Sequence, residues 1–418
     1  MIRRLLGPWN DSGPQIVTEP SMSTLRMLRS PRLGRFVIVS AALAWTGCAA
    51  ERTTTNSRAA QPPIAALADS TFARLHADLS EPAGYFDTDN LISNESSYPH
   101  VLGLLTKLGV SGGTYLGVGP DQNFAYIAAI RPRMAFMVDI RRDNALEHLL
   151  FKALFEAAPT RIEYLALLVG REAPSDPDDW TEASVHEIVR WIDTARTDPA
   201  SAARARTVVD SAVLGSGIPL SDDDRATVRR FHDEFIMNGL DLQFRSFGRA
   251  PRPYYPTLRS LLVAEDLSGR AGGYLARRDD YLYLRDMQRR NLIVPVVGDL
   301  AGGHALAAIA EELRRRGEAV SALYASNVEF YLFQDDAFDG FAENVRGLPI
   351  TPQGVLIRSV FPGGGRMHPH AVPGHYSTQS LQTLESFIEA TGSGGYRSYQ
   401  DLAIRDALDP RADRPDRP

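Results

Sequence analysis

The sequence predicts an α/β fold with a doubly wound, mostly parallel sheet and a mainly helical insertion. Short, continuously apolar runs alternate with helical patterns before residue 160 and again after residue 291. Such alternation is typical of a parallel sheet covered by helices on both faces. The length of 418 residues, 44% of them hydrophobic, allows one large domain with an insertion, or two domains.

Composition excludes several classes of function. A formal net charge of −6 and a pI near 5.9 leave no electrostatic footprint for nucleic acid. Only Lys107 and Lys152 are lysines, and neither follows a glycine-rich loop, so the P-loop signature is absent. The single cysteine, Cys48, excludes internal disulfides and cysteine-rich zinc sites.

The N-terminal segment has the layout of a secretory signal. Arginines at positions 29, 32 and 35 precede an apolar run, residues 36–45, that is too short to span a membrane. The small residues that lead to Cys48 resemble the lipobox of bacterial lipoproteins, although Trp45 departs from its pattern. The resemblance implies lipidation of Cys48 and a membrane anchor facing the periplasm or cell exterior. The alternative is a free cysteine in an uncleaved leader of a cytoplasmic protein.

If the N-terminal segment is a signal, a translation start at Met22 or Met27 suits it better than Met1. Shifts in composition also predict the domain boundaries. The expected segments are a leader (1–48), a polar, proline-ended tether (49–63), the first part of the sheet domain (64–160), the insertion (161–291), the second part of the sheet domain (292–408) and a disordered tail (409–418).

The first βαβ unit contains a candidate ligand site. We expect strands over residues 114–118 and 134–140, joined by a helix that Pro132 ends. Gly117 and Gly119 allow a tight turn and the close approach of a ligand to the backbone. Asp139, twenty residues after Gly119, closes the second strand, where a carboxylate can accept hydrogen bonds from both ribose hydroxyls. The pattern predicts a site for a nucleoside-containing small molecule.

The third glycine of the NAD fingerprint is missing, because the turn continues as "PDQN". The strand, the G-x-G turn and the acid together resemble the first two motifs of class I S-adenosylmethionine-dependent methyltransferases. That resemblance implies a Rossmann-like fold and S-adenosylmethionine as cofactor. The glycine turn would pass under its methionine portion and Asp139 would hold its ribose.

A second alternating segment extends the resemblance. Strands are expected over residues 292–297, 320–326 and 354–361, with a helix over "TQSLQTLESFIEA" after the last. Asp299 follows the third strand, where the family's motif meets the adenine amino group. Asn327 follows the fourth, where the family commonly places a polar residue beside the reacting methyl.

These candidate residues converge because parallel strands present their carboxyl ends at one edge of a sheet. Each has a structural alternative. The glycines can form an ordinary turn, Asp139 can cap a helix near Asn144, Asp299 can cap the helix through His304, and Asn327 can be an ordinary strand-end residue.

A polar loop, "YFDTDNLISNESSYPH", precedes this first unit and carries Asn94 and Glu95. It resembles the segment that closes over the ligand in many methyltransferases; a solvated loop with helix caps is an equally good interpretation. The motifs "DNLISNE", "VDIRR", "VVGD" and "SNVE", in this order, also resemble an uncharacterised bacterial family, which implies a fold more securely than an activity.

The insertion shows helical periodicity. The aromatic and arginine residues of its final part, 254–291, suit either an acceptor pocket or an amphipathic helix with a charged outer face. "GVSGG" at 109–113 precedes a strand, against a nucleophile elbow. His368, His370 and His375 lie among prolines without an adjacent acid, and we assign them no metal.

Two hypotheses follow. One is a methyltransferase that holds donor and acceptor in line, with no general base identified. The other is a membrane-tethered protein that uses a methyltransferase-like scaffold for non-catalytic binding, since S-adenosylmethionine is scarce outside the cytoplasm.

Overall fold

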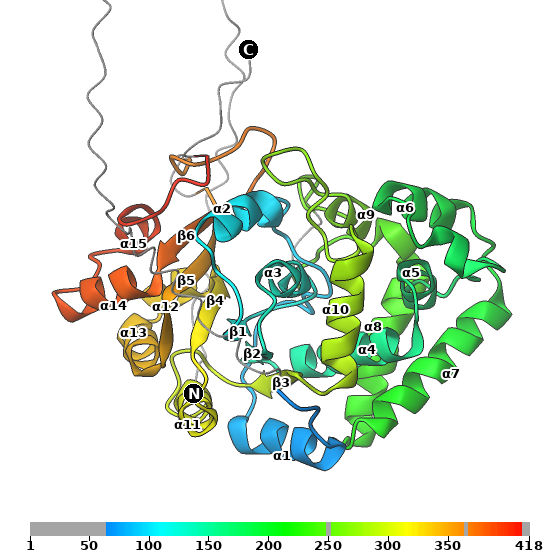
Figure 1. Ribbon diagram of the computed structural model, residues 1–418, viewed down its shortest axis with the longest axis horizontal. Coiled ribbons are helices and arrows are strands. Elements are labelled where there is room, and N and C mark those ends of the chain that lie inside the picture. Colours follow the sequence, from blue (N-terminus) through cyan, green and yellow to red (C-terminus); the bar gives the residue numbers. More distant parts are fainter. Residues whose placement is uncertain (1–63, 248–251, 363–366, 412–418) are drawn as a thin grey trace, which may run out of the picture. The chain divides into compact units, whose positions relative to one another are not determined.

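The computed structural model describes residues 64–247, 252–362 and 367–411, and the fold rests on these. Cys48, the leader and the tether lie outside the described residues. A six-stranded sheet runs through the centre of the described chain in the order β3-β2-β1-β4-β5-β6 (Figure 1). The strands are β1 Thr114–Gly117, β2 Met134–Asp139, β3 Ile293–Val297, β4 Val320–Ser326, β5 Ile350–Val360 and β6 Thr378–Thr383.

Strands β1 to β5 pair in parallel, and only β6 runs antiparallel, against β5. The predicted α/β class with a mostly parallel sheet is confirmed. All six side chains of β2 are buried, as its unbroken apolar run requires. Two neighbouring pairs, β2–β3 and β1–β4, join strands that lie on either side of the insertion in sequence, so the sheet joins both halves of the chain.

One element was predicted wrongly. Residues Thr378–Thr383 form the edge strand β6, whereas the sequence pattern favoured a helix from Thr378. The helix, α14 (Leu384–Gly392), begins only after Thr383, whose hydroxyl caps it by accepting from the Ser386 backbone N–H. The preceding residues are polar yet buried against β5, a pattern that helical periodicity does not capture.

Helices cover both faces of the sheet. One face carries α2 (Leu102–Lys107), α3 (Asn123–Ile130) and α4 (Arg142–Ala157), and the other carries α11 (Ala305–Arg316), α13 (Phe338–Gly347) and α14 (Figure 1). The remaining helices outside the insertion are α1 Asp69–Leu79, η1 Tyr98–Val101, α12 Val328–Gln334 and α15 Tyr399–Ile404.

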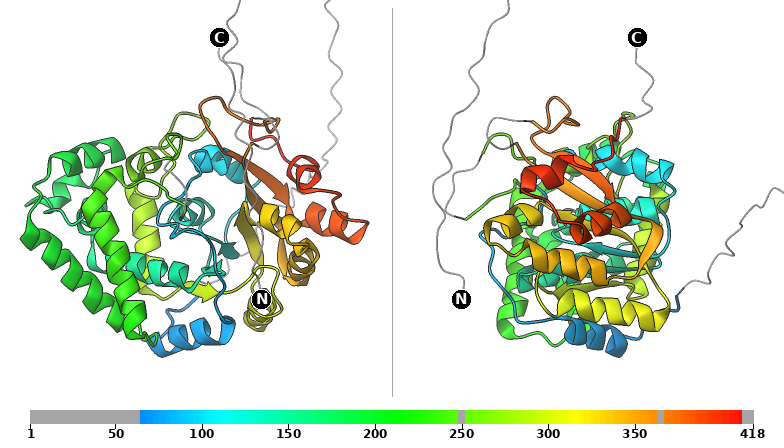
Figure 2. Two further views of the ribbon diagram at one scale, coloured as in Figure 1. Left: turned by 180° about the vertical axis from the view of Figure 1, so that it is seen from behind. Right: turned by 90° about the vertical axis from the view of Figure 1, so that its left-hand side faces the viewer.

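The segment between α4 and β3 is mainly helical in its described residues, and isolated β-bridges join some of its loops. Its helices are α5 Arg161–Leu168, η2 Pro177–Trp180, α6 Val185–Thr194, α7 Pro199–Gly215, α8 Asp222–Asn238, η3 Gly239–Asp241, α9 Leu258–Leu262 and α10 Arg278–Arg289. Capping boxes begin α5, α6 and α8, which explains where these helices start. Figure 2 shows this segment, in green, on one side of the sheet and the C-terminal helices on the other.

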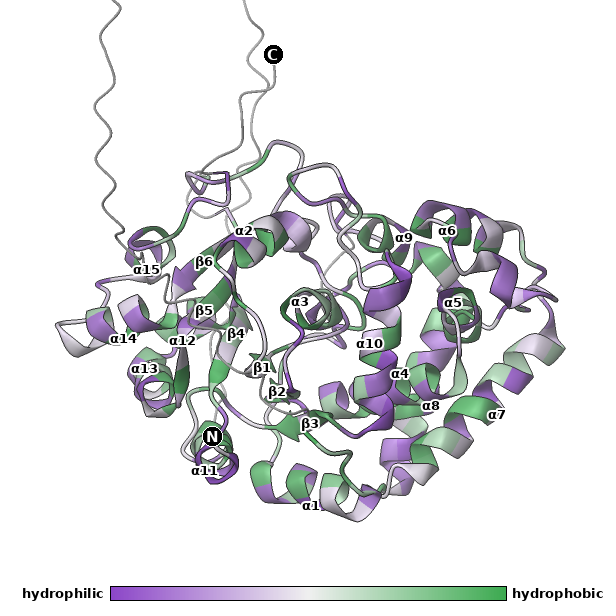
Figure 3. Cartoon of the chain, in the orientation of Figure 1, coloured by the Kyte–Doolittle hydropathy of each residue, from purple (hydrophilic) through white to green (hydrophobic). Residues whose placement is uncertain are grey.

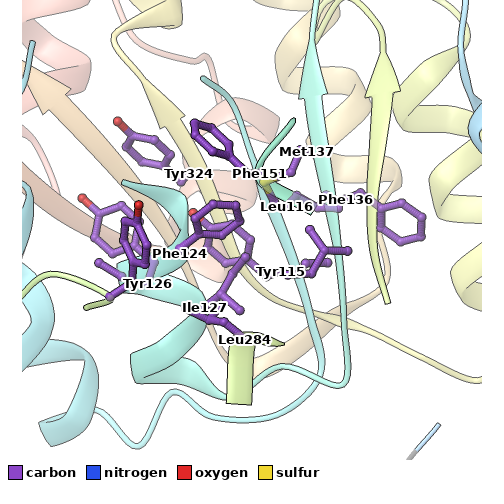
Figure 4. Close-up of a cluster of buried hydrophobic side chains, with 14 of the residues drawn as sticks. Tyr115, Leu116, Phe124, Tyr126, Ile127, Phe136, Met137, Phe151, Leu284 and Tyr324 are labelled. Carbon is purple, nitrogen blue, oxygen red and sulfur yellow. The ribbon is translucent and has the colours of Figure 1, made fainter. Parts of the chain in front are cut away.

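Helix α3 is nearly continuously apolar and buried, whereas the longer insertion helices alternate hydrophobic and hydrophilic faces (Figure 3). Phe124 of α3 lies at the centre of an aromatic cluster, with edge-to-face contacts at 5.4–5.7 Å between ring centroids to Phe151, Phe155 and Tyr274. Figure 4 shows Phe124 and Phe151 among the buried side chains of this core. Each such pair adds about 0.5–1.5 kcal/mol beyond simple burial. The cluster fixes the start of α3 against α4 and the insertion, and therefore positions the turn that precedes it.

Candidate functional site

A segment that we call the strap, residues 81–97, crosses the carboxyl ends of four strands in sheet order. Its Glu81 N–H donates to Val297 of β3 at 2.9 Å, and its Gly84 N–H donates to Ile140, just past β2, at 2.8 Å. Farther along, Asn90 lies beside Gly119 at the end of β1, and Glu95 bonds to side chains of β4. The strap therefore covers the edge of the sheet where the sequence predicts a ligand.

The glycine turn after β1 is filled by the chain's own side chains. A Cβ at Gly117 would lie 2.0 Å from Asn123 Oδ1 and 2.6 Å from a ring carbon of Tyr115. The Tyr115 hydroxyl donates to Asn123 Oδ1 at 2.8 Å, and Asn123 Nδ2 donates to three carbonyls of the turn, those of residues 118–120. Gly119 has a φ of +83°, so its conformation also favours glycine. Internal packing thus explains Gly117, and the backbone conformation explains Gly119.

The carboxylate of Asp139 is occupied by an ion pair with Arg141. Arg141 donates from Nε to Oδ1 and from Nη2 to Oδ2 of Asp139, both at 3.1 Å, and its backbone N–H also donates to Oδ1 at 2.9 Å. Both residues are buried, with 5% and 6% of their surfaces exposed. The remaining guanidinium nitrogen, Nη1, donates to the strap carbonyls of Thr88 and Asp89 at 2.9 and 2.7 Å. The carboxylate predicted to hold ribose is therefore bound to an arginine that also holds the strap.

The other predicted residues lie at the same edge with different contacts. Asp299 caps a turn, because its Oδ1 accepts from the Ala301 N–H and its own N–H donates to Glu81 of the strap. It does not cap α11, whose N-cap is His304. Asn327 is the N-cap residue of α12 but makes no side-chain capping bond. Asn94 is half-buried on the strap, one residue before Glu95.

Glu95 anchors the end of the strap. Its carboxylate accepts from the hydroxyls of Tyr324 and Ser326 on β4, and from Gln379 Nε2 on β6 at 2.9 Å. Burial raises the pKa of this carboxyl, while the hydrogen bonds from Ser326, Tyr324 and Gln379 act in the opposite direction. Three strong donors around one buried carboxyl make it a fixed structural partner for two strands.

A group of polar side chains on α4, which the sequence reasoning missed, lies behind the glycine turn. Asn144, Glu147 and His148 stand at i, i+3 and i+4, so they share one helix face, and each is at most 2% exposed. His148 Nε2 bonds to the Gly119 carbonyl at 2.9 Å. Among the residues that the structure describes, both oxygens of Glu147, both amide atoms of Asn144 and Nδ1 of His148 have no hydrogen-bond partner. The sequence could have indicated this cluster, because "NALEHLLF" carries three polar residues in an otherwise apolar helix.

Burial dominates the electrostatics of this α4 cluster. It raises the pKa of Glu147 well above its usual range, with Arg141 lowering it and Asp121, Asp139 and Asp89 raising it further. It also lowers the pKa of His148 to about 4. A carbonyl oxygen only accepts, so Nε2 of the neutral imidazole is the donor and Nδ1 carries a free lone pair.

The histidines of the 368–375 loop make protein contacts. His368 bonds to the Ala403 carbonyl at 2.9 Å, and His375 Nδ1 lies 3.1 Å from Ser96 Oγ, with its ring against His100. In the described ranges, no group of three or more His, Cys, Asp or Glu side chains is arranged to hold a metal.

A groove of about 850 Å³ lies away from the strand ends. Alanines of α3 form part of its lining, with charged residues from the start of α10. The tyrosines of residues 254–291 do not line it, and Tyr281 is buried on the inner face of α10. The amphipathic-helix interpretation of that segment therefore fits better than the aromatic acceptor pocket.

Within the described part of the chain, no helix combines the length and the apolar character needed to cross a membrane. No curated protein matches this chain. Residues 91–410 match the model of a family described as a domain of unknown function, DUF7790. The match begins inside the strap and includes every candidate site residue except Cys48. Because it covers well over half of the 418 residues, the chain belongs to this family.

Proposed function

We propose that this protein binds a small polar ligand at the carboxyl edge of a Rossmann-like, methyltransferase-like sheet, beneath the strap, and does not transfer methyl groups. The Arg141–Asp139 ion pair carries the proposal, because it occupies the carboxylate that a ribose would need. The second support is Asn123, whose side chain fills the bend of the glycine turn.

The location of the ligand follows from the strand order. The chain reverses direction across the sheet between β1 and β4, and doubly wound sheets bind ligands in the crevice outside such a reversal. The strap crosses this point between Asn90, beside Gly119, and Glu95, beside Ser326. Ligand entry therefore requires the strap to move.

Energetics argue against S-adenosylmethionine in its usual position. Its ribose would displace Arg141 from Asp139, and removing one partner of a buried ion pair costs about 3–5 kcal/mol. Displacing Arg141 would also release its two bonds to the strap. The cofactor would have to offset both losses.

A methyltransferase is the second candidate. The observation that favours it is the placement of Gly119, Asp139, Asp299 and Asn327 at the carboxyl ends of neighbouring strands. In that case an opened strap would expose Asp139, and catalysis would rest on proximity and orientation.

For the cellular location we propose a lipid anchor on Cys48. Its support is the sequence alone: the only cysteine follows an arginine-led apolar run and small residues. A tethered binding protein needs no cytoplasmic cofactor, so this location fits the first candidate better than the second.

Hydrogen exchange of the full chain in the presence of a panel of polar metabolites tests the binding proposal. A ligand is expected to slow exchange of amides in residues 81–97 and to leave the remote helix α7 unchanged. A panel in which no compound changes exchange in the strap would contradict the proposal.

A further inference from the structure

The α4 cluster contains mostly acceptors. Five of its atoms have no partner in the described part of the chain: two carboxyl oxygens of Glu147, the amide oxygen and nitrogen of Asn144, and Nδ1 of His148. Leaving a buried polar group unpaired costs about 1–3 kcal/mol, so a set of five on one helix face points to a bound partner.

The surrounding side chains supply few of the missing donors. Arg141 is the one cation among the main influences on Glu147, and four of its five side-chain N–H groups already donate to Asp139 and the strap. The other main influences on Glu147 are the carboxyl groups of Asp121, Asp139 and Asp89. The site is therefore short of donors, and acidic groups outnumber cations around it.

We infer that the α4 cluster binds the ammonium group of a small molecule that carries a primary amine. An ammonium offers three donors and one positive charge, which match the carboxyl group of Glu147, an amide oxygen and an imidazole lone pair. Its charge would also favour the ionised form of Glu147, which burial alone disfavours. A metal ion fits less well, because among the described residues no group of three or more His, Cys, Asp or Glu side chains is arranged to hold one. The inference rests on the proposed function and names the ligand class for the same site.

The position of the cluster connects it to the strap. His148 bonds to the Gly119 carbonyl, and Asn90 of the strap lies on the Gly119 turn. The amine would therefore reach α4 past the turn when the strap lifts, and the rest of the ligand would lie between the strap and the strand ends.

Thermal unfolding of the full chain tests the inference with methylammonium chloride as the probe. Tetramethylammonium chloride has the same charge and no N–H donors, and potassium and magnesium chloride test inorganic cations. At tenfold excess over its dissociation constant, methylammonium is expected to raise Tm by about 2 °C, more than any of the other salts.

Glu147→Gln keeps the shape of the side chain and removes the carboxylate, so it should abolish the methylammonium shift. Glu311→Gln, an exposed acid on α11, is the matched control and should retain it. If Glu147→Gln does not fold, Asn144→Ala serves as the second variant and should weaken the shift.

Equal shifts from methylammonium and tetramethylammonium, a shift that survives Glu147→Gln, or no shift at all would overturn the inference. So would a larger shift from potassium or magnesium. A different result would overturn the proposed function. A compound without an amine that slows hydrogen exchange in the strap, and binds Glu147→Gln equally well, would refute the ammonium inference but leave the ligand-binding proposal intact.

Discussion

Arg141 forms a two-pronged ion pair with Asp139, two residues before it, and the same guanidinium donates to two carbonyls of the strap. One side chain thus closes the acidic position at the end of β2 and fastens the segment that covers it. Any ligand that takes Asp139 must also loosen the strap.

Replacing Arg141 with alanine should destabilise the fold and open the strap. The substitution leaves the Asp139 carboxylate buried and unpaired, which costs about 3–5 kcal/mol. Denaturant unfolding measures the loss, and faster hydrogen exchange in residues 84–92 reports the opening. Adding Asp139→Asn should recover part of the stability, and Arg74→Ala, which breaks an exposed pair with Asp78, should cost less than about 1 kcal/mol. A strap that exchanges as slowly in Arg141→Ala as in the natural chain would contradict the role of Arg141.

His148 should remain neutral down to mildly acidic pH. Its pKa in the folded protein is lowered to about 4 by burial, below the value near 6.5 of an unfolded histidine. The unfolded chain therefore binds more protons between these values, and this residue's contribution to stability is lost as pH falls from about 6.5 to about 4. NMR of labelled imidazole should show a proton on Nε2 at pH 7. A protonated Nδ1 at that pH, or a titration near 6.5, would refute the assigned bond to Gly119.

Gly117→Ala should destabilise the protein through packing. The new Cβ would meet Asn123 Oδ1 at 2.0 Å, and overpacking of this kind typically costs about 1–3 kcal/mol. Because the closest clash is with Asn123, ahead of the Tyr115 ring at 2.6 Å, the double variant Gly117→Ala/Asn123→Ala should lose less stability than the two single losses added together. Strictly additive losses would show that Asn123 is not what excludes a side chain at this position.

Cells grown with a palmitate analogue should label this protein at Cys48. The Cys48→Ala variant removes the only thiol and should remain unlabelled in the soluble fraction. Equal labelling of both forms, or none of the natural chain, would leave the protein without the proposed anchor.

The fold was largely predictable because the parallel strands contain short, mostly apolar runs. Such runs predicted β2 and β3. In contrast, β6 is mostly polar and buried, and its sequence pattern indicated the start of a helix. Strand pairing is a long-range property, and local periodicity does not report that Ser380 and Gln382 lie against β5.

The sequence predicted where the candidate residues lie in the sheet, but not which contacts their side chains make. Parallel strand order brings Gly119 and Asp139 to one edge of the sheet, independently of the side chains around them. Arg141 turns back onto Asp139, and the Asn123 side chain fills the glycine bend. Both arrangements depend on three-dimensional packing, and the residue types in the neighbouring sequence do not predict them. The α4 cluster could have been found, since Asn144, Glu147 and His148 break an apolar helix at i, i+3 and i+4.

Isothermal calorimetry of the full chain with S-adenosylmethionine and its demethylated product, repeated with Asp139→Asn, tests the central claim most directly. With Asp139 bound to Arg141 and the glycine bend filled by Asn123, both proteins should give no saturable heat. Saturable micromolar binding to the natural chain that disappears in Asp139→Asn would contradict the account and establish the acid as a ribose ligand.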